Sequence, residues 1–155
     1  MSHSTFVDEA RREVPLLRTD QTVRSAVDAV LAAQVPALPV VDDDGRFAGV
    51  FGEREFIHAV FPPYFDALGS ARFVPPSLDH ALEQGGRALE ERVGDHMTTD
   101  HVEVGPEPSD AEIAETFLHH RVLIVPIVED GGRVTGIVTR ADFFRALAER
   151  FCGGS

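Results

Sequence analysis

The chain has 155 residues, 43% of them hydrophobic and 26% charged, which suffices for one ordinary globular core. Its formal net charge of −12 argues against nucleic-acid binding, which needs a Lys/Arg stripe, and against an anionic membrane partner. The single cysteine, Cys152, excludes an internal disulfide. The polar start and the short apolar runs indicate neither a signal peptide nor a membrane span, so we expect a cytoplasmic protein.

The first predicted unit begins with a leading extended piece, VPLL. Behind Thr22, a typical helix N-cap, apolar residues recur at the spacing of a helix buried on one side. The run ALPVV then predicts a strand buried on both faces, DDDG a tight turn, and RFAGVF a second strand that completes a hairpin. A closing helix is expected to begin near Glu53. The order of elements in this unit, residues 8–60, is therefore β-α-β-β-α.

Residues 61–93 are predicted to form a helical insertion. Two proline pairs break helices on its N-terminal side, Pro62-Pro63 and Pro75-Pro76. Apolar residues predict one or two short helices interrupted at Gly85-Gly86, with the stripe Leu78, Leu82, Leu89 and Val93. The insertion holds much of the aromatic content, in Phe61, Tyr64, Phe65 and Phe73. Because aromatic side chains are usually buried, we expect a folded cover for the core, with an interaction surface as the alternative.

The same pattern returns in residues 94–150. An offset of 87 places VPIVEDGGRVTG on LPVVDDDGRFAG with six identities in twelve positions, where chance gives about one. The register extends to a second helix, hairpin and closing helix, which begins near Arg140. Neither unit has enough apolar surface for its own core. We therefore expect an α/β (α+β) fold with two motifs packed as one pseudo-twofold domain, a cleft between them, and a disordered tail at 151–155.

Three features resemble the cystathionine-β-synthase (CBS) domains, which occur as tandem pairs. They are the apolar-Pro-apolar-apolar-acid-x-x-Gly stretch, the Gly-apolar-apolar-Thr-x-x-Asp ending at Asp142, and the Met-Thr of HMTTD. The resemblance implies homodimers shaped as a flat disc. It also implies clefts that bind adenosine-containing ligands such as AMP, ADP, ATP or S-adenosylmethionine.

The clefts of this family are composite, so the resemblance carries over to residues of both copies. It implies that Thr139 and Asp142 meet residues of the first copy, namely Pro15, Leu16, Val35 and Pro36. Asp142 has the chemistry to hold a ribose diol, and Thr139 with Arg140 suits a phosphate at a helix start. Val35 and Ile137 are candidates to line an adenine slot. The alternative is a helix capping box of Thr139 and Asp142 without ligand.

The converse cleft would combine Gly52 and Glu55 with three apolar residues of the second copy, Val102, Val122 and Leu123. Gly52 lacks the hydroxyl of the motif, and Glu55 is one methylene longer than aspartate. Glu53 also stands where the second copy has Arg140, which places an anion near a phosphate. We therefore predict that this cleft is empty or weak and that one site per chain, at Asp142, is used.

Two functions of different classes remain. No residue set suits catalysis, and the histidine spacing fits no metal site, so neither an enzyme nor a metal is expected. The first function is a stand-alone, regulatory CBS-pair homodimer that senses an adenosine nucleotide or S-adenosylmethionine. The second is a ligand-free structural module that docks an unidentified partner protein. Only the first should gain stability when a nucleotide is added.

Overall fold

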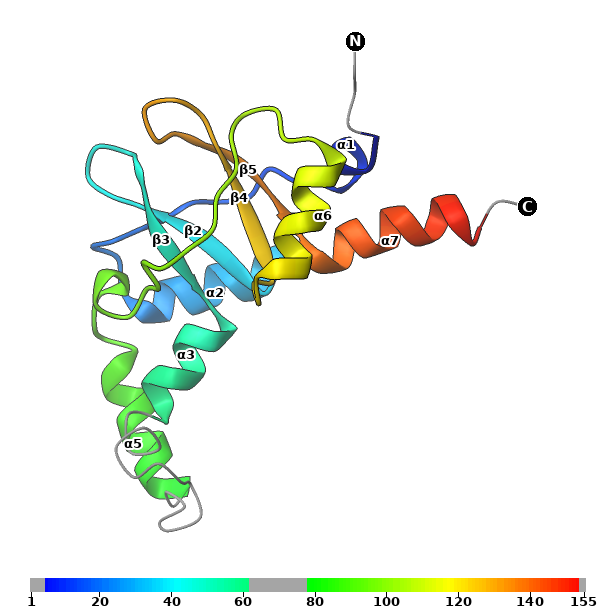
Figure 1. The fold of residues 1–155 in the computed structure, drawn as a ribbon. Helices are drawn as coiled ribbons and strands as arrows, with labels where there is room; N and C mark the ends of the chain where they lie inside the picture. Colours follow the sequence, from blue (N-terminus) through cyan, green and yellow to red (C-terminus); the bar gives the residue numbers. More distant parts are fainter. Residues whose placement is uncertain (1–4, 62–77, 154–155) are drawn as a thin grey trace.

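The computed structural model describes residues 5–61 and 78–153, in which two similar units lie side by side (Figure 1). The first unit consists of β1 (Leu17–Arg18), α2 (Val23–Ala33), β2 (Ala37–Val41), β3 (Phe47–Gly52) and α3 (Glu53–Val60). The second consists of α6 (Asp110–His119), β4 (Ile124–Val128), β5 (Val134–Thr139) and α7 (Arg140–Phe151). A short helix, α1 (Thr5–Ala10), precedes them, and α5 (Leu78–Ala88) and the 3₁₀ turn η1 (Val93–Asp95) lie between them.

The two hairpins have the same register, which confirms the predicted duplication. In the first, Pro39 on β2 pairs with Val50 on β3, and in the second, Pro126 on β4 pairs with Ile137 on β5. Both pairs are related by the offset of 87. The leading strand β1 lies parallel to β2, whereas its counterpart in the second unit is reduced to a single parallel bridge from Val104 to β4.

The segment that precedes each unit crosses to the sheet of the other unit. Arg12 exchanges two backbone hydrogen bonds with Ile137 on β5, both at 2.9 Å. Thr98 does the same with Val50 on β3, at 2.8 and 3.0 Å. A glycine permits each close approach, because a Cβ at Gly49 would lie 2.6 Å from the Thr98 carbonyl oxygen. These crossings bring side chains of one unit to the helix starts of the other.

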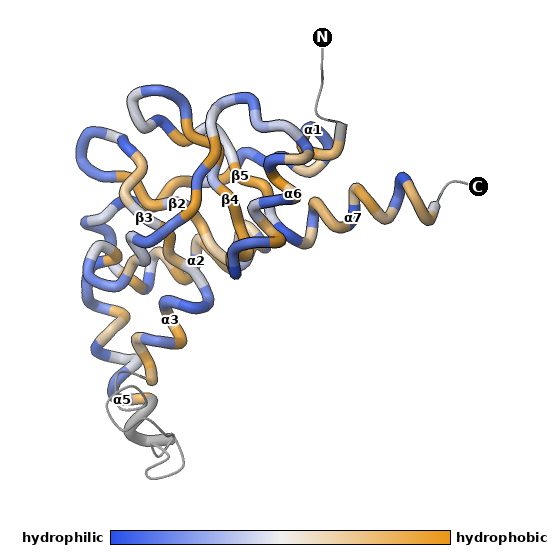
Figure 2. The backbone as a smooth tube through the Cα atoms, in the orientation of Figure 1, coloured by the Kyte–Doolittle hydropathy of each residue, from blue (hydrophilic) through white to orange (hydrophobic). Residues whose placement is uncertain are grey.

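The two units share a core, as expected from their small size. The largest buried cluster consists mainly of first-unit residues but includes Ile124 and Ile137 of the second unit. A second cluster joins β4, β5 and α7 to Val7 and Ala10 of α1. In Figure 2 the hydrophobic residues follow β2 to β5, whereas the hairpin turns are hydrophilic. The tandem motifs therefore form one domain.

The interruption predicted at Gly85-Gly86 is wrong, because α5 runs without a break through both glycines. A Cβ at Gly85 would lie 3.2 Å from Cγ2 of Val60, so the glycine lets α5 pack closely on α3. Tyr64, Phe65 and Phe73 lie outside the described residues. At the C-terminus, α7 continues to Phe151, and Cys152 is exposed and free.

Helix α1 was not predicted from the sequence. Its residues Val7 and Ala10 are buried against the second unit, and the backbone N–H groups of Phe6 and Val7 donate to Asp110 at the start of α6. Helix α1 therefore fixes the position of the segment that follows it, including Arg12.

Candidate functional site

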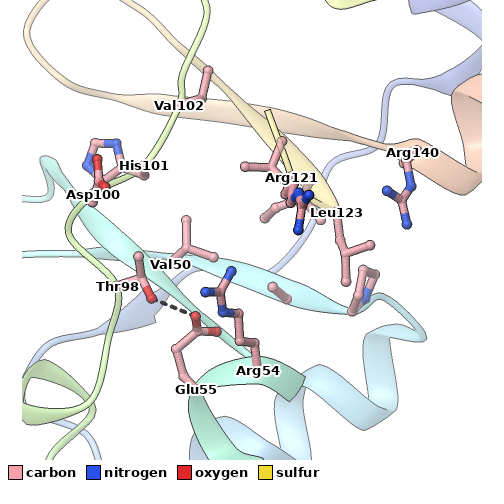
Figure 3. A pocket seen from close by; sticks show the side chains of 14 residues that line it. Val50, Arg54, Glu55, Thr98, Asp100, His101, Val102, Arg121, Leu123 and Arg140 are labelled. Carbon is pink, nitrogen blue, oxygen red and sulfur yellow. Dashed lines mark hydrogen bonds between the residues drawn. The ribbon is translucent and has the colours of Figure 1, made fainter. Parts of the chain in front are cut away.

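A cavity with a volume of about 550 Å³ lies between the two units (Figure 3). One wall comes from the first unit, with Pro36 and Ala37 at the start of β2 and Val50 on β3. The facing wall is formed by residues that precede or begin β4, namely Val102, Val122, Leu123 and Ile124. Apolar walls with a few polar groups are typical of small-molecule sites.

Three arginines line this cavity and come from three different elements. Arg54 is on α3, Arg121 precedes β4, and Arg140 is the first residue of α7. Within residues 5–61 and 78–153, none of their side chains forms an ion pair or a hydrogen bond. Three unpaired guanidinium groups in a chain with a net charge of −12 make the cavity a local concentration of positive charge.

Glu55 lies at the cavity wall and is only 9% exposed. Its Oε1 accepts a hydrogen bond from the backbone N–H of Gly52 at 2.8 Å, and its Oε2 accepts one from the hydroxyl of Thr98 at 2.6 Å. The side chain thus folds back onto the start of its own helix, in the position of the acidic residue of a capping box. Each oxygen keeps a second lone pair with which to accept another hydrogen bond.

Asp100 and His101 also line the cavity, and Figure 3 shows them on the side away from Arg140. The His101 ring packs on Phe47, with the ring centroids 4.2 Å apart. Its Nδ1 atom is buried and has no hydrogen-bond partner among the described residues. The cavity is therefore polarised, with an acidic and imidazole side opposite an arginine side.

Asp142 lies elsewhere, in a separate polar cleft of about 330 Å³ between α1 and α7. Arg12 donates to both of its carboxylate oxygens, from Nε at 2.7 Å and from Nη2 at 3.2 Å. Arg145 donates from Nη1 at 2.8 Å. The backbone N–H of Asp142 donates to the Thr139 hydroxyl at 3.0 Å, so Thr139 caps α7. Among the described residues, the Asp142 carboxylate accepts no hydrogen bond from the backbone N–H of Thr139, which a full capping box requires.

The pKa of Asp142 is lower than that of an ordinary aspartate. Burial of the carboxyl group acts in the opposite direction and is the largest single influence. The hydrogen bonds and charge of Arg12, with contributions from Thr139 and Arg145, outweigh it. Asp142 is thus a permanently ionised carboxylate with two cationic partners at neutral pH.

The two helix-start carboxylates follow one plan. Each is bound by the residue that crosses from the other unit, Thr98 for Glu55 and Arg12 for Asp142. The longer acid, Glu55, is paired with the short side chain of Thr98. The shorter acid, Asp142, is paired with the long side chain of Arg12. Arg12 and Thr98 pair with equivalent hairpin residues, Ile137 and Val50, but lie 86 residues apart, one less than the offset of the hairpins, so the repeat alone does not align them.

The predicted site residues are divided between several places. Pro36 and Arg140 line the large cavity, whereas Thr139, Val35 and Ile137 are buried at the helix start or in the core. Pro15 and Leu16 are exposed and line neither the cavity nor the Asp142 cleft. By contrast, four of the five residues predicted for the converse cleft come together, since Glu55, Val102, Val122 and Leu123 line the cavity. Gly52 borders the apolar groove beside Phe51 and Glu53 instead.

No three His, Cys, Asp or Glu side chains of residues 5–61 and 78–153 are grouped so that they could hold a metal ion. None of the helices in this part of the chain combines the length and apolar character needed to cross a bilayer.

The chain thus consists of two copies of one α+β unit that share a core and have a cavity between them. In the second copy the leading strand is reduced to a single bridge. The sequence matches the CBS domain family twice, over residues 7–62 and 93–149, which together make up more than half of the chain. The chain therefore belongs to the CBS domain family and is a tandem CBS pair.

Known proteins with the same architecture support this assignment. The CBS domain of a membrane protein from Sphaerobacter thermophilus is 27% identical, with a TM-score of 0.68 over 93% of this chain and 88% of that one. CBSX2, solved in complex with AMP, has the same fold, with 21% identity and a TM-score of 0.67 over 96% of this chain and 98% of that one. An uncharacterized protein of Methanocaldococcus jannaschii is 23% identical over 124 residues, 74% of each chain.

Proposed function

We propose that this chain is a regulatory CBS pair that binds an adenosine nucleotide in the cavity beside Glu55. The observation that carries the proposal is the convergence of Arg54, Arg121 and Arg140, unpaired within the described residues, on one cavity of a strongly acidic chain. Guanidinium groups suit phosphate because they donate several hydrogen bonds in a planar arrangement.

The other parts of a nucleotide also have partners in this cavity. The apolar walls around Val50 and Val102 suit a base, and the remaining lone pairs of Glu55 suit ribose hydroxyls. The AMP bound by CBSX2, a protein of the same fold, supports an adenosine ligand. S-adenosylmethionine is disfavoured because it has no phosphate and carries a positive sulfonium beside three cations.

The proposed site differs from the one expected at Asp142. A ribose could bind the Asp142 carboxylate only by displacing or sharing its hydrogen bonds with Arg12 and Arg145. A ribose hydroxyl is a neutral donor, so this exchange would replace an ion pair and leave a partly buried guanidinium without its carboxylate partner, which costs free energy. Ligand binding at Asp142 is therefore opposed by the protein itself.

A thermal-shift titration of the purified protein with AMP, ADP, ATP, S-adenosylmethionine and GTP tests this proposal. We expect a saturable rise in Tm with an adenosine nucleotide, corresponding to about 3 kcal/mol at one hundred times the Kd. Arg54→Gln should weaken this response about tenfold, whereas Arg150→Gln, an exposed arginine of α7 outside the cavity, should not. Absence of any shift, or a response unaffected by Arg54→Gln, would overturn the proposed site.

A second observation supports a homodimer, whether or not a ligand binds. Leu31 on α2 and Ile57 on α3 are 70% and 59% exposed, and they border a small apolar groove of about 230 Å³. Their counterparts at an offset of 87, Leu118 and Phe144, are 82% and 68% exposed. The same two apolar positions are thus exposed in both units. We propose that these helix faces associate with a second copy of the chain.

Light scattering coupled to size exclusion tests the homodimer. We expect the wild-type chain to elute with the mass of a dimer at micromolar concentration. The double substitution Ile57→Asp with Phe144→Asp should give the mass of a monomer, because it places one carboxylate in each of the two apolar faces. Leu82→Asp, at an exposed leucine of α5 that does not line the apolar groove, is the control. A monomeric wild-type protein, or a dimer that survives the double substitution, would contradict the proposal.

A further inference from the structure

We propose that the cavity beside Glu55 selects nucleotides with two or more phosphates, and that the phosphate chain bridges the two CBS motifs. This inference rests on the proposed nucleotide binding and specifies its ligand class. It assigns the discrimination between mono- and polyphosphates to Arg121 and Arg140 of the second unit, with Arg54 of the first unit next to the sugar.

The first argument is the spread of the positive charge. Figure 3 shows the guanidinium groups of Arg54, Arg121 and Arg140 at separate points across the cavity, not gathered around one point. Guanidinium groups at separate points suit a ligand with several anionic groups better than one compact phosphate. A chain of two or three phosphates presents oxygens at successive positions and is able to contact several guanidinium groups in turn.

The second argument gives the direction of the ligand. Arg54 is adjacent to Glu55 on α3, so the first phosphate after a ribose at Glu55 would meet Arg54 first. Arg140 lies on the opposite side of the cavity from Asp100 and His101 (Figure 3). The base therefore fits the Asp100 side, where no arginine lies, and the terminal phosphates fit the Arg140 side.

The third argument is that Arg140 is held at a fixed place. Its backbone N–H donates to the carbonyl oxygen of Leu123 at 2.9 Å, which joins the start of α7 to the cavity wall. Two residues later, Asp142 is bound by Arg12 and Arg145. The first turn of α7 is thus anchored at Arg140 by Leu123 and at Asp142 by the two arginines. The side chain of Arg140 therefore extends into the cavity from a rigid part of the backbone.

The last argument concerns the repulsion between the units. Without an anion, Arg54 of the first unit faces Arg121 and Arg140 of the second across the cavity. A polyphosphate that contacts both sides neutralises this repulsion and links the motifs. A monophosphate next to Arg54 would leave the two second-unit arginines without a partner.

Isothermal titration of the full chain with AMP, ADP and ATP in magnesium-free buffer tests the inference. We expect the affinity to rise about tenfold from AMP to ADP and again towards ATP, in the range of charged hydrogen bonds. Arg140→Gln should lower the affinity for ATP about tenfold and change the affinity for AMP less than twofold. Arg54→Gln should weaken all three nucleotides, and Arg150→Gln none of them.

All three cavity arginines have exposed side chains, so the substitutions should leave the Tm of the ligand-free protein unchanged or slightly raised. Equal affinities for AMP and ATP, or equal losses for both in Arg140→Gln, would overturn the polyphosphate inference while nucleotide binding stands. Binding of no nucleotide by the wild-type chain would overturn both.

Discussion

Replacement of Asp142 by asparagine is expected to lower the free energy of unfolding by about 2–3 kcal/mol at pH 7. The carboxylate is 8% exposed and accepts hydrogen bonds from two arginines, one of which is bidentate. Asparagine keeps the size of the side chain but loses the charge and one acceptor. Arg12 is then left beside a neutral amide in a half-buried position, with its backbone still paired to β5.

Urea unfolding of the wild-type protein, Asp142→Asn, Arg12→Gln and the double variant measures this effect. Because Arg12 and Asp142 are direct partners, the loss in the double variant should be smaller than the sum of the two single losses. Additive losses would mean that the ion pair does not stabilise the fold as the geometry indicates. Arg11→Gln is a matched control, since Arg11 is exposed and its guanidinium donates to Thr135.

The same pair makes the stability depend on pH in a defined direction. The pKa of Asp142 is lowered in the folded protein, so its carboxylate stabilises the fold fully above the unfolded pKa of about 4. This contribution decreases as the pH falls through the lower, folded pKa. The difference between wild type and Asp142→Asn should therefore be constant from pH 7 to about pH 5 and shrink below about pH 4. A difference that stays constant down to pH 3 would exclude the charge as its cause.

The local elements were predictable because their signals lie within a few residues. Thr22 and Thr139 cap their helices as expected, and the two hairpins follow from short apolar runs around glycine turns. The duplication also predicted that the units share one core, since neither has enough apolar surface alone. The caps and hairpins depend on residues that are close together in the sequence, and the duplication depends on a repeated pattern. Both kinds of signal are visible in the sequence itself.

The surroundings of the candidate site were harder to predict because they depend on contacts between distant segments. Nothing near Asp142 in the sequence indicates that Arg12, 130 residues earlier, binds its carboxylate. The motif Thr-x-x-Asp therefore suggested a free ribose acceptor, and the weaker-looking Glu55 was assigned to an empty cleft. The arginines of the cavity also come from three separate segments, and only the folded chain brings them together.

Gly52 shows how a departure from the family motif can have a structural cause. From the sequence, the glycine appeared to be the loss of a ligand-binding hydroxyl. In the structure, a Cβ at Gly52 would overlap the carbonyl oxygen of Pro36 and the Cα of Ala37. The φ of Gly52 is −171°, an extended conformation open to any residue, so the restriction is one of space. Its counterpart Thr139 caps α7 with a side chain that Gly52 has no room for.

Gly52→Ala is therefore expected to destabilise the protein by about 3 kcal/mol, the upper part of the range for overpacked cores. The clash is with backbone atoms, which cannot turn aside as the end of a flexible side chain can. Gly86→Ala on α5 is the matched control, because a Cβ there meets nothing within 4 Å and alanine favours a helix by about 1 kcal/mol. Urea unfolding of both variants measures the contrast.

The larger substitution Gly52→Thr separates the structural from the functional interpretation of this position. If space is the reason for the glycine, restoring the family's threonine should destabilise the fold at least as much as alanine and should not improve nucleotide binding. If instead Gly52→Thr folds with wild-type stability and binds a nucleotide more tightly, the missing hydroxyl is a property of the ligand site. In that case the β2–β3 pairing at Ala37 must be able to open, because only such a movement makes room for the added side chain.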